Sequence, residues 1–152
     1  MARLVAGDRA PEVTLESESG PVTLSRLPGR VVLYFYPKDD TPGCTTEACE
    51  FQSLRLEIAA AGATIVGVSP DSVKRHAKFR AKYELEFALL SDPDHVAAEA
   101  YGVWIEKSLY GRRYMGVERS TFLIGPDGTL EAAHYGVAPA GHAASVLERL
   151  RG

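Results

Sequence analysis

The hydrophobic positions of the chain follow two patterns, one typical of strands and one typical of helices. Residues 31–36, 63–68 and 87–90 are short, almost uniformly apolar runs that contain many β-branched or aromatic side chains. Runs of this length and composition are typical of strands that are buried on both faces of a sheet. We therefore predict a sheet with these three segments near its centre.

Apolar side chains at helical spacing predict four helices between and after these strands. They cover residues 45–61, 70–83, 94–101 and 138–151. Gly62 suits the C-cap of the first helix. Ser69 is a good N-cap for the second helix, and Pro70 suits its first helical position.

Turn signals predict a β-hairpin on either side of this alternation. Residues 12–25 alternate loosely around the sequence SESG, while residues 119–124 and 129–134 flank a GPDG turn. Strands that alternate with helices favour a largely parallel sheet covered on both faces. The sequence therefore predicts an α/β, thioredoxin-like fold in one domain, residues 1–152. Its central sheet is expected to be mixed but mostly parallel, flanked by helices, and preceded by an N-terminal β-hairpin.

The composition excludes some classes of function but does not identify one. The chain has 152 residues, a net charge of −3, and 45% hydrophobic residues, as expected for an ordinary soluble domain. A negative net charge argues against general nucleic-acid binding. No apolar run approaches the length of a membrane span, and the first residues lack the apolar core of a signal peptide. We therefore expect a cytoplasmic protein with no membrane or nucleic-acid partner.

Both cysteines of the chain lie in one polar segment that directly follows the first apolar strand. Cys44 and Cys49 stand within PKDDTPGCTTEACE, where the strand leads into a helix. Backbone N–H groups in the first turn of a helix have no intrahelical partner, and the helix dipole is positive there. Both effects favour the reactive thiolate form of a cysteine. The segment therefore indicates sulfur chemistry at Cys44.

The spacing of the two cysteines predicts a conformational requirement. Cys44 and Cys49 are five positions apart, which on an ideal helix gives a Cα–Cα distance of roughly 8.5 Å. A disulfide requires about 4.4–6.8 Å. If both residues are helical, a disulfide between them therefore requires part of the helix to unwind.

Other roles for the cysteines stay open at this point. The spacing is C-x4-C, not the C-x-x-C of general disulfide oxidoreductases. Zinc binding requires further ligands, and the four histidines are scattered at positions 76, 95, 134 and 142. Cysteines that simply pack in the core remain an alternative, above all for Cys49.

The segment FYPKDDTPGCTTEACEF resembles the active site of peroxiredoxins, most closely of the peroxiredoxin Q subgroup, also called bacterioferritin comigratory protein. The family pattern P-x-x-x-[ST]-x-x-C matches Pro37, Thr41 and Cys44, and the subgroup's second cysteine matches Cys49. The resemblance continues through KYELEFALLSDPDHVAAEAYGVW and YGRRYMGVERSTFLIGPDGTL, and so covers nearly the whole chain.

This resemblance implies a thiol-dependent peroxidase. Cys44 is then the peroxidatic cysteine, which attacks a hydroperoxide and becomes a sulfenic acid. Cys49 is the resolving cysteine, which condenses with it to an intramolecular disulfide. Thioredoxin or a similar dithiol is the expected reductant, and no metal, haem or flavin cofactor is needed. We expect a monomer or a weak dimer.

Three residues around Cys44 have expected roles in shaping the peroxide site. The Thr41 hydroxyl can reach the thiolate or the peroxide by a hydrogen bond, since it lies three residues before Cys44. Pro37 restricts the loop and shields the pocket from water. Gly43 places bare backbone beside the sulfur.

Two charged residues complete the expected site. Arg119 begins a predicted strand and matches the family's active-site arginine, whose planar donors suit a thiolate and a peroxide oxygen together. Glu47 lies on the same helix face as Cys44 and is expected to relay a proton, to hold Arg119, or to pair with the helix dipole. We expect Lys107, Arg112 and Arg113 to lie in a solvated loop.

A different class of function fits the same geometry. A redox-sensing or chaperone-like interaction protein would also use a helix that unwinds on oxidation. Slow reaction with peroxide, together with a partner that binds only one redox state, would favour this alternative. Insulin reduction would favour a general disulfide oxidoreductase.

Overall fold

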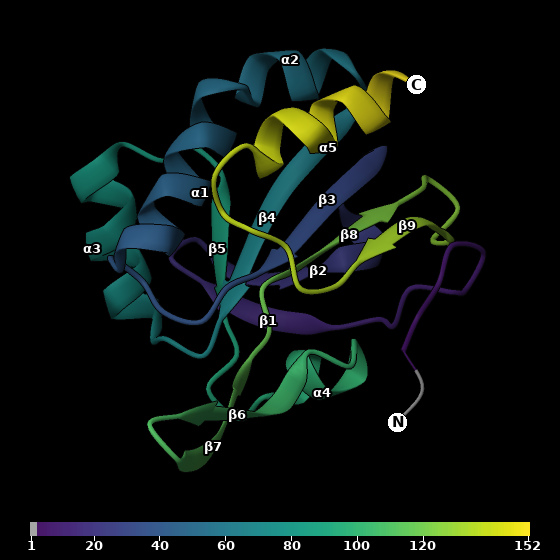
Figure 1. Cartoon of the computed structure of the whole chain (residues 1–152). Helices are drawn as coiled ribbons and strands as arrows, with labels where there is room; N and C mark the ends of the chain where they lie inside the picture. The colour runs from purple at the N-terminus through teal and green to yellow at the C-terminus, as the bar shows by residue number, and fades with distance from the viewer. Residues whose placement is uncertain (1–2) are drawn as a thin grey trace.

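The computed structural model describes residues 3–152, and its centre is a seven-stranded sheet in the order β2-β1-β5-β4-β3-β8-β9 (Figure 1). The strands of this sheet are β1 (Thr14–Ser17), β2 (Gly20–Thr23), β3 (Arg30–Phe35), β4 (Ala63–Ser69), β5 (Ala88–Ser91), β8 (Ser120–Ile124) and β9 (Leu130–His134). The helices are η1 (Leu24–Arg26), α1 (Pro42–Ser53), α2 (Arg55–Ala60), α3 (Val73–Tyr83), α4 (Val96–Ala100) and α5 (His142–Arg151). A separate hairpin pairs β6 (Trp104–Leu109) with β7 (Arg112–Val117). The order and layers confirm the predicted thioredoxin-like α/β fold.

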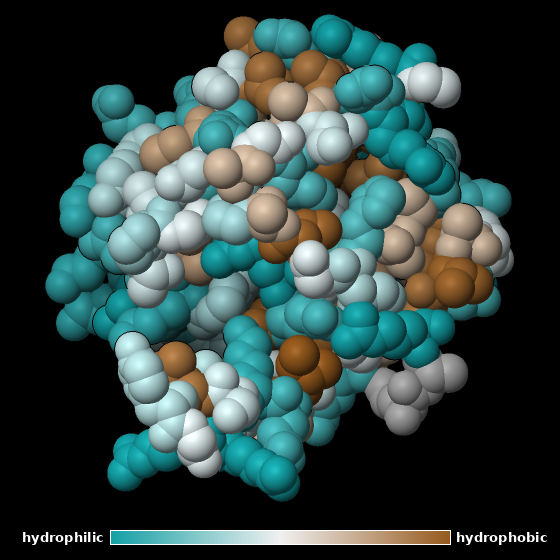
Figure 2. All heavy atoms as spheres, in the orientation of Figure 1, coloured by the Kyte–Doolittle hydropathy of each residue, from teal (hydrophilic) through white to brown (hydrophobic). Residues whose placement is uncertain are grey.

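The strand β3 shows why the apolar runs were informative. Val32 and Tyr34 pack into a core beneath α1, α2, α3 and α5, whereas Val31, Leu33 and Phe35 pack into a second core on the α4 side. Successive side chains of a strand point to opposite faces, so a strand between two cores has to be apolar throughout. The outer surface in this orientation is mainly hydrophilic, and apolar residues reach it as small separate patches (Figure 2).

The sheet is mixed, as predicted, but most of its pairings are antiparallel. Only β3 with β4 and β4 with β5 pair in parallel, and these are the strands that α1, α2 and α3 connect. The pairs β1–β2, β1–β5, β3–β8 and β8–β9 are antiparallel. The expectation of a mostly parallel sheet was therefore wrong, because hairpin turns and returning strands add antiparallel neighbours on both sides of the parallel centre.

Several helix boundaries differ from the prediction. The helix expected over residues 138–151 begins only at His142, as α5, and the one expected over residues 94–101 is the shorter α4, Val96–Ala100. The helix expected over residues 45–61 begins earlier, at Pro42, and is divided at Leu54 into α1 and α2. Ser69 ends β4 and is not an N-cap; α3 begins after Ser72, whose side chain accepts a hydrogen bond from the Arg75 N–H. Pro70 was therefore a misleading signal, because a proline can equally follow a strand.

The region of Lys107, Arg112 and Arg113 is a β-hairpin, which contradicts the predicted loop. Tyr110 and Gly111 both have positive φ, 52° and 77°, as a type I′ hairpin turn requires. The sequence does not signal this turn strongly, because tyrosine is uncommon in the left-handed region. The hairpin projects below the main sheet in Figure 1.

None of the helices within residues 3–152 has the length and apolar character needed to cross a membrane.

Candidate active site

Cys44 lies in the first turn of α1, just beyond the carboxyl end of β3. Thr41 has an extended backbone and precedes Pro42, which occupies the first helical turn and suits it because its missing N–H needs no partner there. The Cys44 side chain is only 2% exposed. The predicted position of the thiol at a helix N-terminus is thus confirmed, in a site that excludes most water.

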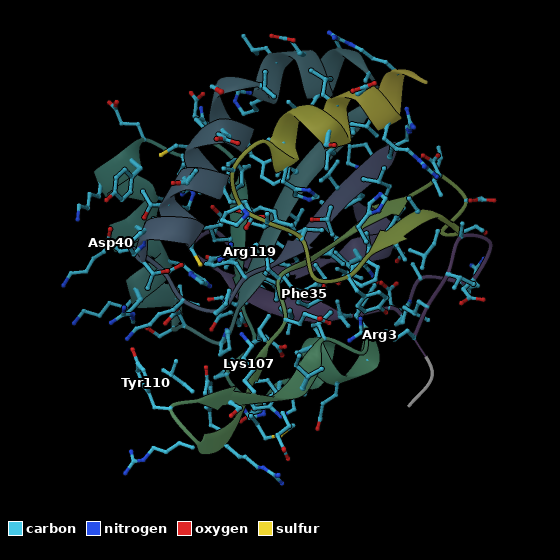
Figure 3. All side chains as sticks on the ribbon, in the orientation of Figure 1. Arg3, Phe35, Asp40, Lys107, Tyr110 and Arg119 are labelled. Carbon is cyan, nitrogen blue, oxygen red and sulfur yellow. The ribbon has the colours of Figure 1, made fainter. Side chains whose placement is uncertain are left out.

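Arg119 reaches this thiol from a distant part of the sequence. It directly precedes β8, and Ser120 at the start of β8 pairs with Phe35 at the end of β3. Because the two strands are antiparallel, this register places Arg119 beside the loop that leads to Cys44 (Figure 3). The Arg119 Nη2 donates to Cys44 Sγ at 3.3 Å, and the Nη1 donates to Glu47 Oε1 at 2.6 Å.

Glu47 is completely buried one turn further along α1. Burial raises the pKa of Glu47 to about 7, although the Arg119 charge acts in the opposite direction. Its second oxygen, Oε2, has no hydrogen-bond partner among residues 3–152. Of the three expected roles, the structure shows Glu47 holding Arg119; α1 has no acidic residue in its first turn. Glu47 therefore fixes the guanidinium while leaving one oxygen free within the site.

The pKa of Arg119 reflects the same balance. Burial alone would lower the pKa of Arg119, but the charges of Glu47 and Cys44 raise it above its usual value. The guanidinium thus stays positively charged although it is largely shielded from water, and a fixed charge acts strongly on a neighbouring thiolate in such surroundings.

Cys49 lies in the same helix but in a different environment. It is half-buried, and burial raises the pKa of its thiol. Both cysteines are free and both lie within α1, so the helical geometry assumed for them applies. A disulfide between them requires α1 to unwind locally.

Of the three neighbours expected to shape the site, Gly43 closely approaches Arg119. A Cβ at Gly43 would lie 3.2 Å from the Arg119 Nη2, so a larger residue would press on the guanidinium. The Thr41 hydroxyl donates to the Lys38 carbonyl at 2.9 Å, so it is engaged within the loop in this state. Pro37 lies half-buried in the bend between β3 and α1.

Lys107 is a site neighbour that the sequence reasoning missed. Burial lowers the pKa of this half-buried lysine, and the Arg119 charge lowers it further, while Cys44 acts in the opposite direction. Lys107 lies on β6 below Arg119 in Figure 3. A hairpin prediction would have been needed to find it, because its approach to the site depends on how the hairpin folds back.

The histidines have other partners. His76 pairs with Asp39, His142 contacts Thr121, and His95 stacks on Trp104 with ring centroids 3.7 Å apart. Within residues 3–152 there is no group of three or more His, Cys, Asp or Glu side chains suited to hold a metal ion.

Comparison with known proteins places this geometry in a family. The sequence model of the AhpC/TSA family matches residues 6–133. This chain belongs to the AhpC/TSA family.

Its relatives define the subgroup as well. The chain is 48% identical over 147 residues to peroxiredoxin Bcp of Bacillus subtilis, covering 95% of this chain and 94% of the relative. It is 41% identical to a cysteine-to-serine mutant of Xylella fastidiosa PrxQ, whose crystal structure matches with a TM-score of 0.93 over 99% of this chain and 98% of that one. The bacterioferritin comigratory protein of Xanthomonas campestris, described with alkyl peroxide reduction activity, is 45% identical with a TM-score of 0.86, over 91% and 90% of the two chains. The protein is therefore a peroxiredoxin of the Bcp/PrxQ subgroup, a thiol peroxidase, which confirms the resemblance that the sequence suggested.

Within this peroxiredoxin, the motif residues divide into two groups. Cys44, Glu47, Arg119 and Gly43 form one contiguous cluster, in which Cys44 and Glu47 are buried and the other two are half-buried. Cys49 is half-exposed further along α1. The arrangement provides one thiol beside a fixed cation and a second thiol that has to move to reach it.

Proposed function

We propose that this peroxiredoxin reduces hydrogen peroxide and organic hydroperoxides through Cys44, with Cys49 as the resolving thiol and thioredoxin or a similar dithiol as the reductant. The observation that carries the proposal is the 3.3 Å contact between the Arg119 guanidinium and Cys44 Sγ at the start of α1. The alkyl peroxide reduction described for the Xanthomonas campestris relative supports the inclusion of organic substrates.

In the first step the Cys44 thiolate attacks the terminal oxygen of the hydroperoxide. An S–O bond forms, the O–O bond breaks, and the leaving oxygen takes a proton to become water or an alcohol. Arg119 has donors for both the thiolate and the peroxide oxygen, and it stabilises the charge that develops on the departing oxygen. Glu47 fixes the guanidinium in place from the other side. Thr41 can take part once its hydroxyl leaves the Lys38 carbonyl.

In the second step Cys49 attacks the Cys44 sulfenic acid. An S–S bond forms, the S–O bond breaks, and water leaves. Because both sulfurs lie in α1, this step requires the helix to unwind locally. The existing division between α1 and α2 at Leu54 offers a natural end for that unwinding.

In the third step a dithiol reductant returns Cys44 and Cys49 to thiols by disulfide exchange and becomes a disulfide itself. Thiols supply both electrons of the cycle, so the proposed reaction uses no metal, haem or flavin. A reducing, cytoplasmic environment suits such a reductant, and we propose that the protein acts as a monomer or weak dimer.

The test is peroxide consumption at pH 7 with a complete thioredoxin system, comparing the native protein with Cys44→Ser. We expect steady turnover in the native protein and none above background in the variant. A native protein that starts with both thiols free yet fails to consume peroxide would exclude the proposal and favour the redox-sensing alternative.

A further inference from the structure

A buried Asp–His pair, Asp39 and His76, ties the active-site loop to α3 and lies outside the cluster around Cys44. Asp39 and His76 are 2% and 0% exposed, and the His76 Nδ1 lies 2.6 Å from Asp39 Oδ2. The His76 Nε2 lies 2.9 Å from the Leu90 carbonyl of β5, which can only accept a hydrogen bond. The Nε2 therefore donates to this carbonyl, while the Nδ1 on the other side of the ring meets the Asp39 carboxyl group.

Asp39 is held from two further directions. The Tyr36 hydroxyl donates to Asp39 Oδ1, and the Asp39 backbone N–H donates to Asp71 Oδ2 at 2.7 Å. Burial and the neighbouring Tyr34 and Asp39 raise the pKa of Tyr36 well above its usual value, so its hydroxyl keeps its proton. Asp39 is thus bound to Tyr36 just after β3, to His76 of α3 and to Asp71 in the segment before α3.

The next residue turns the chain toward α1. Asp40 has φ 58°, in the left-handed region, where Asp is among the few non-glycine residues tolerated. Its carboxylate accepts from Lys82 Nζ at 2.7 Å and from the Tyr83 hydroxyl at 2.8 Å, both at the end of α3. The loop before Cys44 is therefore attached to α3, whereas α1 itself begins only at Pro42.

We propose that Asp39 and His76 are positioning residues: their buried pair holds the loop to α3, confines the unwinding of α1 to residues after Asp40, and returns Cys44 to Arg119. This inference rests on the proposed function, since it concerns the same thiol. Removal of either partner leaves the other buried without its hydrogen bond, and the cost of that unsatisfied polar group favours release of the loop. Asp40 alone is a weaker anchor, because its contacts are exposed and exposed ion pairs contribute little.

The first test uses alkylation of Cys44 by iodoacetamide as a function of pH, in a Cys49→Ser background so that one thiol remains. In Asp39→Asn and His76→Gln we expect the pH midpoint of alkylation to move upward, because Cys44 loses its fixed place beside Arg119. Tyr36→Phe removes one hydroxyl and should give a smaller shift in the same direction, which keeps the test decisive if the other variants fold poorly. Leu130→Ala is the matched control: it weakens the core on the opposite face of the sheet but does not touch the loop.

The second test is a single turnover with peroxide in the two-cysteine protein. We expect Cys44 oxidation to slow about 10- to 100-fold in Asp39→Asn and His76→Gln, because a small displacement of a reacting group has effects of that size. Disulfide formation from the sulfenic acid should not slow, because a released loop unwinds more readily.

Native rates and a native alkylation midpoint in both variants would overturn the positioning role. An equal shift in Leu130→Ala would overturn it too, since general loss of stability would then explain the result. A native protein that does not react with peroxide would overturn the proposed function instead, and the alkylation profiles would still decide the role of Asp39 and His76.

Discussion

Cys44 and Cys49 are five residues apart on one helix, but their surroundings differ in almost every respect. Cys44 is 2% exposed, lies in the first turn of α1, and receives a hydrogen bond from Arg119. Cys49 is half-exposed, and burial raises the pKa of its thiol. Helix position and one fixed cation therefore distinguish an attacking thiol from a resolving thiol within a single motif.

The difference also explains why the two thiols need not meet in the resting protein. A buried thiol beside a cation is poised for peroxide, whereas a protonated thiol nearer the surface reacts slowly until a sulfenic acid forms. Keeping the two apart in α1 leaves Cys44 free to react, and the unwinding step then brings them together.

The largest effect on turnover is expected when Cys49, the resolving thiol, is replaced. Cys49→Ser should lose thioredoxin-supported turnover almost completely, because no intramolecular disulfide can form, while the first oxidation of Cys44 keeps its native rate. The variant should also proceed to Cys44 sulfinic acid with excess peroxide, which mass spectrometry detects as two added oxygens. A Cys49→Ser protein that recycles normally with thioredoxin would contradict the resolving role.

The next largest effect is expected when Arg119, the cation that contacts Cys44, is replaced. Arg119→Met should slow Cys44 oxidation by about 10²- to 10³-fold, the usual cost of losing one charge-stabilising donor. Stopped-flow measurement of the single-turnover rate checks this. The oxidation rate of Arg119→Lys should lie between those of the native protein and Arg119→Met, because lysine keeps the charge but lacks the planar pair of donors. Arg113→Met, which removes a highly exposed cation of β7, is the control and should react at the native rate.

A smaller effect is expected when the carboxylate that holds Arg119 is replaced. Glu47→Gln should slow Cys44 oxidation about tenfold, because a hydrogen bond to a charged group contributes about 1.5 kcal/mol. Glu57→Gln, which removes an exposed carboxylate of α2, should leave the rate unchanged.

The same variant has a defined effect on stability. Burial raises the pKa of Glu47 from 4.5 to about 7, so in this window the folded protein binds a proton that the unfolded chain has released. The free energy of unfolding should therefore fall as the pH rises from 4.5 to 7, and Glu47→Gln should flatten this part of the profile. Urea denaturation at several pH values measures it. An unchanged slope in Glu47→Gln would show that another group is responsible.

The strands of the fold were predictable because burial on two faces leaves a continuous apolar run, as in β3 and β4. The start of α3 and the β6–β7 hairpin were predicted wrongly, because they depend on contacts and backbone conformations that a short stretch of sequence does not reveal. Ser69 and Pro70 resemble a helix start, but Ser69 instead exchanges hydrogen bonds with Asp71 at the end of β4. The β6–β7 hairpin was missed because its turn places Tyr110 at positive φ, a conformation that tyrosine rarely adopts.

The chemistry of α1 can be derived from the amino-acid sequence alone: a thiol in the first turn, a second thiol five residues later, and a geometry that forbids their disulfide while the helix is intact. The charged groups around Cys44, by contrast, are brought there by tertiary packing. Arg119 reaches the thiol because the antiparallel register pairs Ser120 with Phe35, and Glu47 then holds the guanidinium. Asp39 and His76, 37 positions apart, meet for a similar reason, as α3 folds back over the active-site loop. Helix position is a local property, whereas the partners of a buried charge depend on which distant strands and helices pack beside it.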